Sequence, residues 1–182
     1  MRFVEKRRSA TSPFICCMQL GIISDTHSFI DDRILNHLAD CDMIIHAGDV
    51  GDESVLDKLE SLNETVCVYG NIDDQRIRKR CPLFELVEVD KLRVLVVHIA
   101  GVGEKYNSTT SKLIAKHNPD VLICGHSHIL KVFNPKSFNH VHINPGAAGR
   151  HGFHKTRTLI KVEVIGGKLC NMRVVELGGR ST

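Results

Sequence analysis

The sequence contains no tryptophan, and aromatic residues make up only 5% of its 182 residues. Proteins that bind single-stranded nucleic acid stack the bases on aromatic side chains, so this composition argues against such a function. The net charge is only +3, and no dense stripe of lysine and arginine follows the first few residues. Because duplex binding usually needs several phosphate contacts, we expect no nucleic-acid duplex as a partner.

The sequence also lacks any run of about 20 apolar residues, so we expect no membrane partner. Near the start, Arg2 and the basic residues 6–8 precede a short apolar patch at 14–18. That patch is too short for the apolar region of a good signal peptide. We therefore expect residues 1–17 to be a disordered extension and residues 18–182 to form a single domain.

The cysteines do not form the pattern of a disulfide-bonded protein. There are seven of them, an odd number, they contain no CxxC pair, and Cys67 and Cys124 lie inside apolar runs. Free thiols in the reducing cytoplasm are favoured over the alternative, a disulfide scaffold.

What the sequence does contain is an ordinary globular composition, with 42% hydrophobic and 25% charged residues. A chain of this length can bury about 70% of its unfolded surface, enough for a core. The first half alternates apolar runs with helical patterns, which indicates parallel βαβ units and an α/β fold. The expected strands cover 18–24, 42–47 and 65–69, and the expected helices cover 31–39 and 52–61. Asp31 and Asp52 are the expected N-caps of the two helices.

The second half is expected to contain more antiparallel structure. Residues 83–98 are predicted to form a hairpin that turns at Asp90-Lys91, followed by a helix over 109–117 and a strand over 120–124. The remainder, 129–177, is predicted to consist mostly of short strands, with a hairpin at Gly166-Gly167.

Polar side chains follow five of the apolar runs at the point where each run ends. In open α/β sheets, ligands bind outside the carboxyl ends of the strands, so these side chains are expected at one site. Aspartate, histidine and asparagine are ligands for divalent metals. The five segments are Asp25-Thr26-His27, Gly48-Asp49, Gly70-Asn71, His98 and Gly125-His126-Ser127-His128.

Taken singly, most of these segments have an ordinary structural explanation. Asp25 and His27 could be a turn aspartate and a surface histidine, and Asp49 and Asn71 could be turn residues. His98 could equally be a core histidine whose hydrogen bonds are satisfied. The pair in Gly125-His126-Ser127-His128 favours metal binding even alone, because two histidines at this spacing are uncommon by chance.

In this order, and each after a strand, the five segments resemble the calcineurin-like metallophosphoesterases, and more narrowly the small YfcE-type phosphodiesterases. The similarity covers about residues 18–178 and includes the turn Asn144-Pro145-Gly146. The resemblance implies a four-layer α/β/β/α sandwich of two mixed sheets flanked by helices. It also implies hydrolysis of a small phosphate ester, most simply a phosphodiester, by a metal-activated water.

The resemblance further implies two adjacent divalent metal ions, with Mn²⁺ expected first and Zn²⁺, Fe, Ni²⁺ or Mg²⁺ as alternatives. Asp25, His27 and His128 would hold the first ion, and Asn71, His98 and His126 the second. Asp49 would bridge them, which gives Asp49, Asn71 and His98 the catalytic positions. Two ions about 3.5–4 Å apart can clamp a phosphoryl group and ionise a shared water.

The sequence departs from the family at two positions. Many relatives carry a histidine after Gly-Asn that protonates the leaving group, and here Ile72 stands there, although the YfcE-type subgroup also lacks this histidine. Ile99 follows His98 where the family often has glycine. Another donor or a water must then serve, or the leaving group must be a good one.

Four further assignments stay open at this point. The same fold can serve as a protein-assembly scaffold, as in the retromer small subunit, but a scaffold has no need to keep all seven ligand residues. It can also serve as a nuclease, but the weak positive charge counts against that function. His46 could orient Asp49 or simply pack. A basic cluster could be a solvated loop or a phosphate clamp. Its members are His151, His154, Lys155 and Arg157. A homo-oligomer is also possible.

Overall fold

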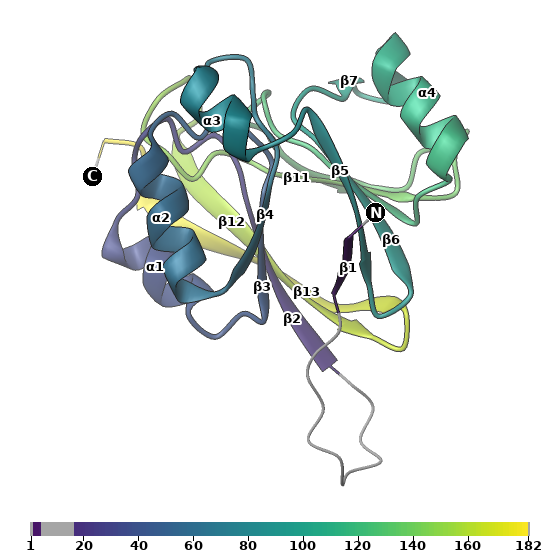
Figure 1. Cartoon of the computed structure of the whole chain (residues 1–182), viewed down its shortest axis with the longest axis horizontal. Coiled ribbons are helices and arrows are strands. Elements are labelled where there is room, and N and C mark those ends of the chain that lie inside the picture. Colours follow the sequence, from purple (N-terminus) through teal and green to yellow (C-terminus); the bar gives the residue numbers. More distant parts are fainter. Residues whose placement is uncertain (1, 5–16, 182) are drawn as a thin grey trace, which may run out of the picture.

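The structure is a computed structural model that describes residues 2–4 and 17–181. In these residues two large β-sheets pack face to face, and helices cover their outer faces (Figure 1). One sheet has the strand order β13-β12-β2-β3-β4 and the other the order β1-β5-β6-β9-β11-β10. This is the predicted four-layer α/β/β/α sandwich.

The five-stranded sheet is built from the predicted βαβ units. Its parallel strands are β2 (Cys17–Ile23), β3 (Met43–His46) and β4 (Glu64–Cys67). They alternate with α1 (Asp32–Leu38) and α2 (Glu53–Leu62). Both predicted N-caps are confirmed, because Asp31 accepts from the Ile34 N–H and Asp52 from the Ser54 N–H.

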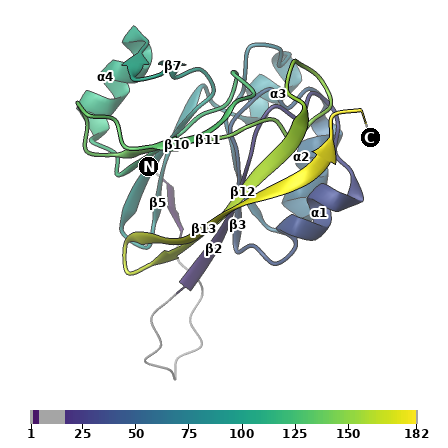
Figure 2. The same ribbon diagram turned by 180° about the vertical axis from the view of Figure 1, so that it is seen from behind.

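The antiparallel end of this sheet differs from the prediction of short strands. β12 (Thr156–Ile165) and β13 (Lys168–Gly179) form one long hairpin around the predicted turn at Gly166-Gly167 (Figure 2). β12 also pairs with β2, so it is hydrogen-bonded on both edges. The polar residue Lys161 interrupts the apolar pattern of β12. Its side chain is buried, and its charge is paired with Asp40.

The six-stranded sheet contains the predicted hairpin, with its turn at Asp90-Lys91. Its strands are β1 (Arg2–Val4), β5 (Phe84–Val89), β6 (Leu92–Val97), β9 (Val121–Ile123), β10 (Leu130–Phe133) and β11 (Val141–Pro145). The helix α4 (Ser108–His117) lies over its outer face (Figure 1). It ends at Asn118 in a left-handed conformation, directly before Pro119.

The main core lies between the two sheets. Leu20, Ile22 and Ile45 from one sheet meet Val94 and Ile123 from the other, and all five are at most 1% exposed. Two smaller clusters lie under the helices on the outer faces. The sheets are thus fixed to each other, and the loops at the carboxyl ends of their parallel strands converge at one end of the molecule.

Besides β1, three short elements were not predicted. They are the helix α3 (Gln75–Arg80) and the small hairpin of β7 (Gly101–Val102) and β8 (Lys105–Tyr106). Within α3 only Ile77 is buried, so the sequence has no apolar periodicity there. Asp74 caps this helix by accepting from the Arg76 and Ile77 N–H groups.

The predicted boundary between an extension at 1–17 and a domain at 18–182 stays a prediction. Arg2–Val4 pairs in parallel with β5 and Cys17 begins β2, whereas residues 1, 5–16 and 182 lie outside the described part. No helix of the described residues combines the length and apolarity needed to cross a bilayer.

Candidate metal centre

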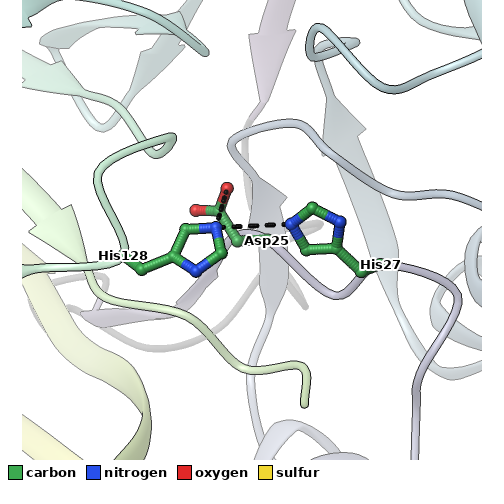
Figure 3. A group of neighbouring side chains, drawn as sticks. All are labelled: Asp25, His27 and His128. Atoms are coloured by element: carbon green, nitrogen blue, oxygen red, sulfur yellow. Dashed lines mark hydrogen bonds and ion pairs between the residues drawn. The ribbon is translucent and has the colours of Figure 1, made fainter. Parts of the chain in front are cut away.

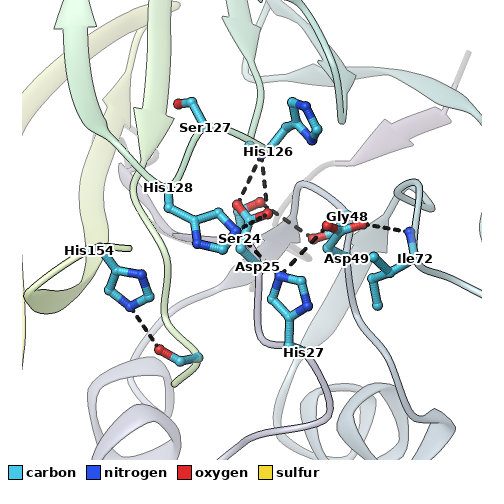
Figure 4. Close-up of polar contacts among 12 residues, drawn as sticks. Ser24, Asp25, His27, Gly48, Asp49, Ile72, His126, Ser127, His128 and His154 are labelled. Atoms are coloured by element: carbon cyan, nitrogen blue, oxygen red, sulfur yellow. Dashed lines mark hydrogen bonds and ion pairs between the residues drawn. The ribbon is translucent and has the colours of Figure 1, made fainter. Parts of the chain in front are cut away.

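All seven predicted ligand residues meet where the parallel strands end. Figure 4 labels Asp25, His27, Asp49, His126 and His128 among them. Six of the seven form two groups whose ligand atoms lie within 4.8 Å of one another. The groups are Asp25, His27 and His128, and Asp49, His98 and His126. The seventh residue, Asn71, joins the second group through His98. Each comes from a loop after β2, β3, β4, β6 or β9, as expected from the strand-end pattern.

In the first group two imidazoles and a carboxylate face a common point (Figure 3). The Nε2 atom of His128 lies 3.3 Å from Asp25 Oδ1 and 3.3 Å from His27 Nε2. Asp25 is buried, and both of its carboxylate oxygens accept from the His126 backbone N–H at 3.2 and 3.1 Å. This contact joins the loop after β2 to the loop after β9 and fixes the carboxylate opposite the histidines.

In the second group the tautomer of His98 can be deduced from its partners. His98 Nδ1 lies 2.8 Å from the Ala47 carbonyl oxygen, which can only accept, so Nδ1 carries the hydrogen in the neutral ring. The other ring nitrogen, Nε2, lies 3.2 Å from Asp49 Oδ1 and 3.1 Å from Asn71 Oδ1. A backbone carbonyl on the far nitrogen is the usual way to orient a metal-binding imidazole.

Asp49 lies between the two groups. Its Oδ2 atom is 3.7 Å from His27 Nε2 of the first group, and its Oδ1 is 3.2 Å from His98 Nε2 of the second. The Ile72 backbone N–H donates to Oδ1 at 3.1 Å. This one carboxylate therefore faces both groups, which is the arrangement expected of a bridging ligand.

The charges in the site follow from burial and from neighbouring groups. Burial acts to raise the pKa of Asp49, but the hydrogen bond from His98 and the charges of His98 and His27 lower it overall. Burial acts to lower the pKa of His98, and the contact with Asp49 outweighs it, so this pKa is raised. The Asp25 contact raises the pKa of His128, whereas burial lowers that of His27. The Asp49 carboxylate thus stays ionised beside basic nitrogens.

The backbone at five of the predicted ligand residues is held in an unfavourable conformation. Asp25, His27, Asp49, His126 and His128 have φ values of 55°, 47°, 55°, 67° and 56°. Such left-handed conformations are rare in residues other than glycine and cost on the order of 1 kcal/mol or more each. Strain of this kind is concentrated at functional sites, where the surrounding structure maintains it.

A cavity of about 550 Å³ opens above the ligands. It is lined by His27, Asp49, Asn71, Ile72, His126, Ser127, His128, Ile129, His151, Gly152, Phe153 and His154. Ile72 is half-exposed at its edge, and Phe153 is fully exposed. The volume is within the usual range of small-molecule sites.

The structure divides the predicted basic cluster. The His151 ring lies 4.8 Å from that of His27, and the His154 ring 5.3 Å from that of His128, so both line the cavity. Arg157 does not, because it is 1% exposed and pairs with Asp31 at 3.1 Å beneath the sheet. Lys155 is not part of the lining either. A phosphate clamp that includes Arg157 is therefore wrong, and its role is structural.

His46 acts on the backbone rather than on the Asp49 side chain. Its Nδ1 accepts from the Gly48 N–H at 3.2 Å, and its Nε2 lies 2.9 Å from Thr26 Oγ1. Burial lowers the pKa of His46 to about 4, so the ring is neutral. It ties the loop that carries Asp49 to the loop that carries His27.

Sequence reasoning missed Asp73 as a residue of this site. Its carboxylate accepts from the backbone N–H groups of Val50, Gly51 and Gly70 at 3.2, 2.7 and 2.7 Å. It therefore holds the Asp49 loop against the Asn71 loop. The only signal in the sequence was a carboxylate three residues after Gly70.

The turn Asn144-Pro145-Gly146 supports the histidine loop from below. Asn144 Nδ2 donates to the Gly125 carbonyl at 2.8 Å and to Ser127 Oγ at 3.1 Å. It thus fixes Gly125, which precedes the two histidines, and Ser127, which lies between them. This gives a physical reason for the turn that formed part of the sequence resemblance.

Residues 18–166 match the family model described as the calcineurin-like phosphoesterase superfamily domain. The chain belongs to this family. It is 32% identical over 117 residues to the probable metallophosphoesterase MJ0623 of Methanocaldococcus jannaschii, a match that covers 61% of this chain and 59% of that protein. The chain therefore spans less than two thirds of that relative's length.

Two solved structures have the same fold. An archaeal phosphodiesterase superposes with a TM-score of 0.69 at 24% identity, covering 87% of this chain and 99% of that one. Vps29 of Chaetomium thermophilum superposes with a TM-score of 0.70 at 19% identity, covering 87% and 96%. The family assignment and the fold are thus confirmed, whereas the role of each ligand stays a prediction.

Proposed function

We propose that this chain is a phosphodiesterase with a dinuclear metal centre. Asp25, His27 and His128 hold one divalent cation, and Asn71, His98 and His126 hold the other. The position of Asp49 between the two groups carries the proposal, since its carboxylate faces histidines of both. Membership of the metallophosphoesterase family supports it.

The donor set fits divalent metals. The two groups offer carboxylate oxygens, an amide oxygen and imidazole nitrogens. When the His98 ring is neutral its hydrogen is on Nδ1, which leaves Nε2 able to bind a cation. No lysine or arginine is among the described residues that line the cavity. Mixed oxygen and nitrogen donors accept Mn²⁺, Zn²⁺, Fe, Ni²⁺ or Mg²⁺ according to supply, and the family resemblance makes Mn²⁺ the first expectation. The bound cations would supply charge neutralisation at the phosphoryl group and a water of lowered pKa.

The chain's own residues position these components. Asp49 stays ionised and is held by the Ile72 N–H, so it can face both cations at once. His151 and His154 line the cavity wall and can approach the substrate. The Ile72 side chain has no proton to donate to the leaving group. Hydrolysis therefore requires a good leaving group or a proton donor other than Ile72. The cavity volume suits a small phosphate ester. We place this activity in the cytoplasm and expect no nucleic-acid duplex as a partner.

The test is hydrolysis of bis(p-nitrophenyl) phosphate by metal-stripped protein to which single divalent ions are added back. We expect no hydrolysis without metal and recovery with Mn²⁺. Asp32→Asn is the matched control for changes in the centre, because Asp32 is an exposed aspartate in the first turn of α1. Tight binding of two ions without hydrolysis of any phosphate ester would refute the catalytic proposal.

A second candidate is a metal-binding scaffold for protein assembly, which the likeness to Vps29 favours. A scaffold does not need activity, so the same assay separates the two functions. Binding of metal with no turnover across mono- and diesters, at any added ion, would favour the scaffold.

A further inference from the structure

A second cavity lies beside the metal centre, under α3 and α4, which occupy the same end of the molecule in Figure 1. We call it the side pocket. Its volume is about 280 Å³. It is lined by Tyr69, Gly70, Asn71, Arg78, Leu83, Phe84, Val97, His98, Ile99, Asn107, Thr109, Thr110 and Leu113.

The side pocket adjoins the candidate metal centre. Asn71 lines both cavities, and His98, which belongs to the second ligand group, lines the side pocket. Their facing atoms, Asn71 Oδ1 and His98 Nε2, are 3.1 Å apart. A phosphate ester bound at the ligands would therefore have one of its substituents at the mouth of the side pocket.

The polar residues in the lining already have their hydrogen bonds within the protein. Asn107 Nδ2 donates to the Ile99 carbonyl at 2.7 Å, and Asn107 Oδ1 accepts from the Thr110 N–H at 2.8 Å. The Thr110 hydroxyl donates to the same carbonyl at 3.3 Å. Since Asn107 and Thr110 are satisfied within the protein, this side of the pocket needs no polar group from a ligand.

The flat side chains in the wall favour a planar ring. The Arg78 guanidinium lies over the Tyr69 ring, 4.7 Å from its centroid, and Arg78 Nε donates to the Asp73 carbonyl at 2.8 Å. No carboxylate pairs with Arg78 within the described part of the chain. Its flat guanidinium is thus held in place at a pocket whose other walls include Phe84 and Leu113. Flat cations and aromatic edges pack well against aromatic rings.

We propose that the side pocket binds a planar aromatic ester substituent of a substrate whose phosphoryl group lies at the metal centre. This inference rests on the proposed function. An apolar cavity of about 150 Å³ holds a benzene molecule, so the larger side pocket can hold one ring or two fused rings. The chain thereby selects aryl or heteroaryl phosphate esters over small alkyl ones.

The first experiment compares two anions that cannot be hydrolysed. Phenylphosphonate and methylphosphonate are titrated by calorimetry into Mn²⁺-loaded protein, and we expect phenylphosphonate to bind about ten-fold tighter or more. Thr109→Trp, at an exposed position of the lining, should remove this advantage and leave methylphosphonate binding unchanged. Ala115→Trp is the matched control, because Ala115 is exposed on the same helix but is not part of the lining.

The second experiment separates failure of the pocket from failure of the proposed function. Benzyl alcohol, which has no phosphorus, is added to methyl-labelled protein with and without Mg²⁺, which is diamagnetic and leaves the methyl resonances visible. We expect the methyl resonances of Leu113 and Leu83 to shift in both cases, and these shifts to disappear in Thr109→Trp. If the resonances shift but neither phosphonate binds, the side-pocket proposal stands and the proposed metal centre is overturned. Equal affinity for the two phosphonates, with no shift of Leu113, would overturn the side-pocket proposal alone.

Discussion

Replacing Asp49 with asparagine tests the centre most directly, because the change alters charge and hardly alters shape. The new amide would keep an oxygen for the Ile72 N–H, which now donates to Oδ1 at 3.1 Å. It would lack the negative charge that lies 3.2 Å from His98 and 3.7 Å from His27. Because Asp49 is 2% exposed, little solvent is available to compensate.

The expected loss can be worked out from these contacts. Removing a ligand of both cations should weaken metal binding by more than the 10–100-fold typical of residues that only support a ligand. Charge stabilisation by metals contributes several kcal/mol to the transition state, and about 4 kcal/mol corresponds to a 10³-fold fall in kcat/KM. The fold should survive, since the shape and the Ile72 hydrogen bond are retained.

Three measurements check this on one preparation. Elemental analysis after metal loading and dialysis should give fewer than two ions per chain for Asp49→Asn and two for the Asp32→Asn control. Hydrolysis of bis(p-nitrophenyl) phosphate should fall about 10³-fold, while circular dichroism stays unchanged. Two tightly held ions with intact activity would show that Asp49 does not bridge them.

Three further predictions concern other residues. His126→Ala and His128→Ala should each lose a different ion, seen by anomalous scattering, and loss of the same ion from both would contradict the two groups of ligands. Since Ile72 cannot donate a proton, kcat/KM should depend steeply on the pKa of the leaving group, and Ile72→His should help alkyl esters by about 10²-fold and aryl esters less; a flat dependence in the unmodified protein would reveal a donor already present. Burial lowers the pKa of His142 to about 4, so its stabilising effect is full above pH about 6.5 and is lost as the pH falls toward 4. As the pH falls from about 6.5 to about 4, the unfolding free energy of His142→Gln should decrease by about 3 kcal/mol less than that of the unmodified chain. Urea titration at each pH measures this; equal decreases would show that His142 is not the group.

The sequence predicted which residues would converge at one site, because parallel strands impose a common edge. Runs such as β2 and β3 are buried on both faces, so the first polar residues after them must lie at the carboxyl ends of the sheet. Convergence of Asp25, Asp49 and His126 then follows from topology. The turn Asn144-Pro145-Gly146 could be recognised as a motif, but not its contact with Gly125.

What the sequence could not predict depends on long-range packing. Arg157 lies in a basic segment that could have been a phosphate-binding loop. It is instead part of β12, which places its side chain beneath the sheet, where it donates to Asp31. α3 has one buried residue and no apolar period, so nothing in its sequence distinguishes it from a loop. The side pocket depends on how α3 and α4 lie relative to each other, and that arrangement is set by contacts between distant segments.

The left-handed backbone at five ligand residues has a consequence for how this chain could change. Glycine adopts such φ values without penalty, so replacing His126, whose side chain is exposed, by glycine would relieve strain there without removing a buried hydrogen bond. A descendant that no longer needed metal would therefore gain melting temperature from such a substitution. A chain that carries aspartate or histidine at all five positions is less stable than it could be. Selection for a working centre and selection for a more stable fold therefore favour different residues at these positions.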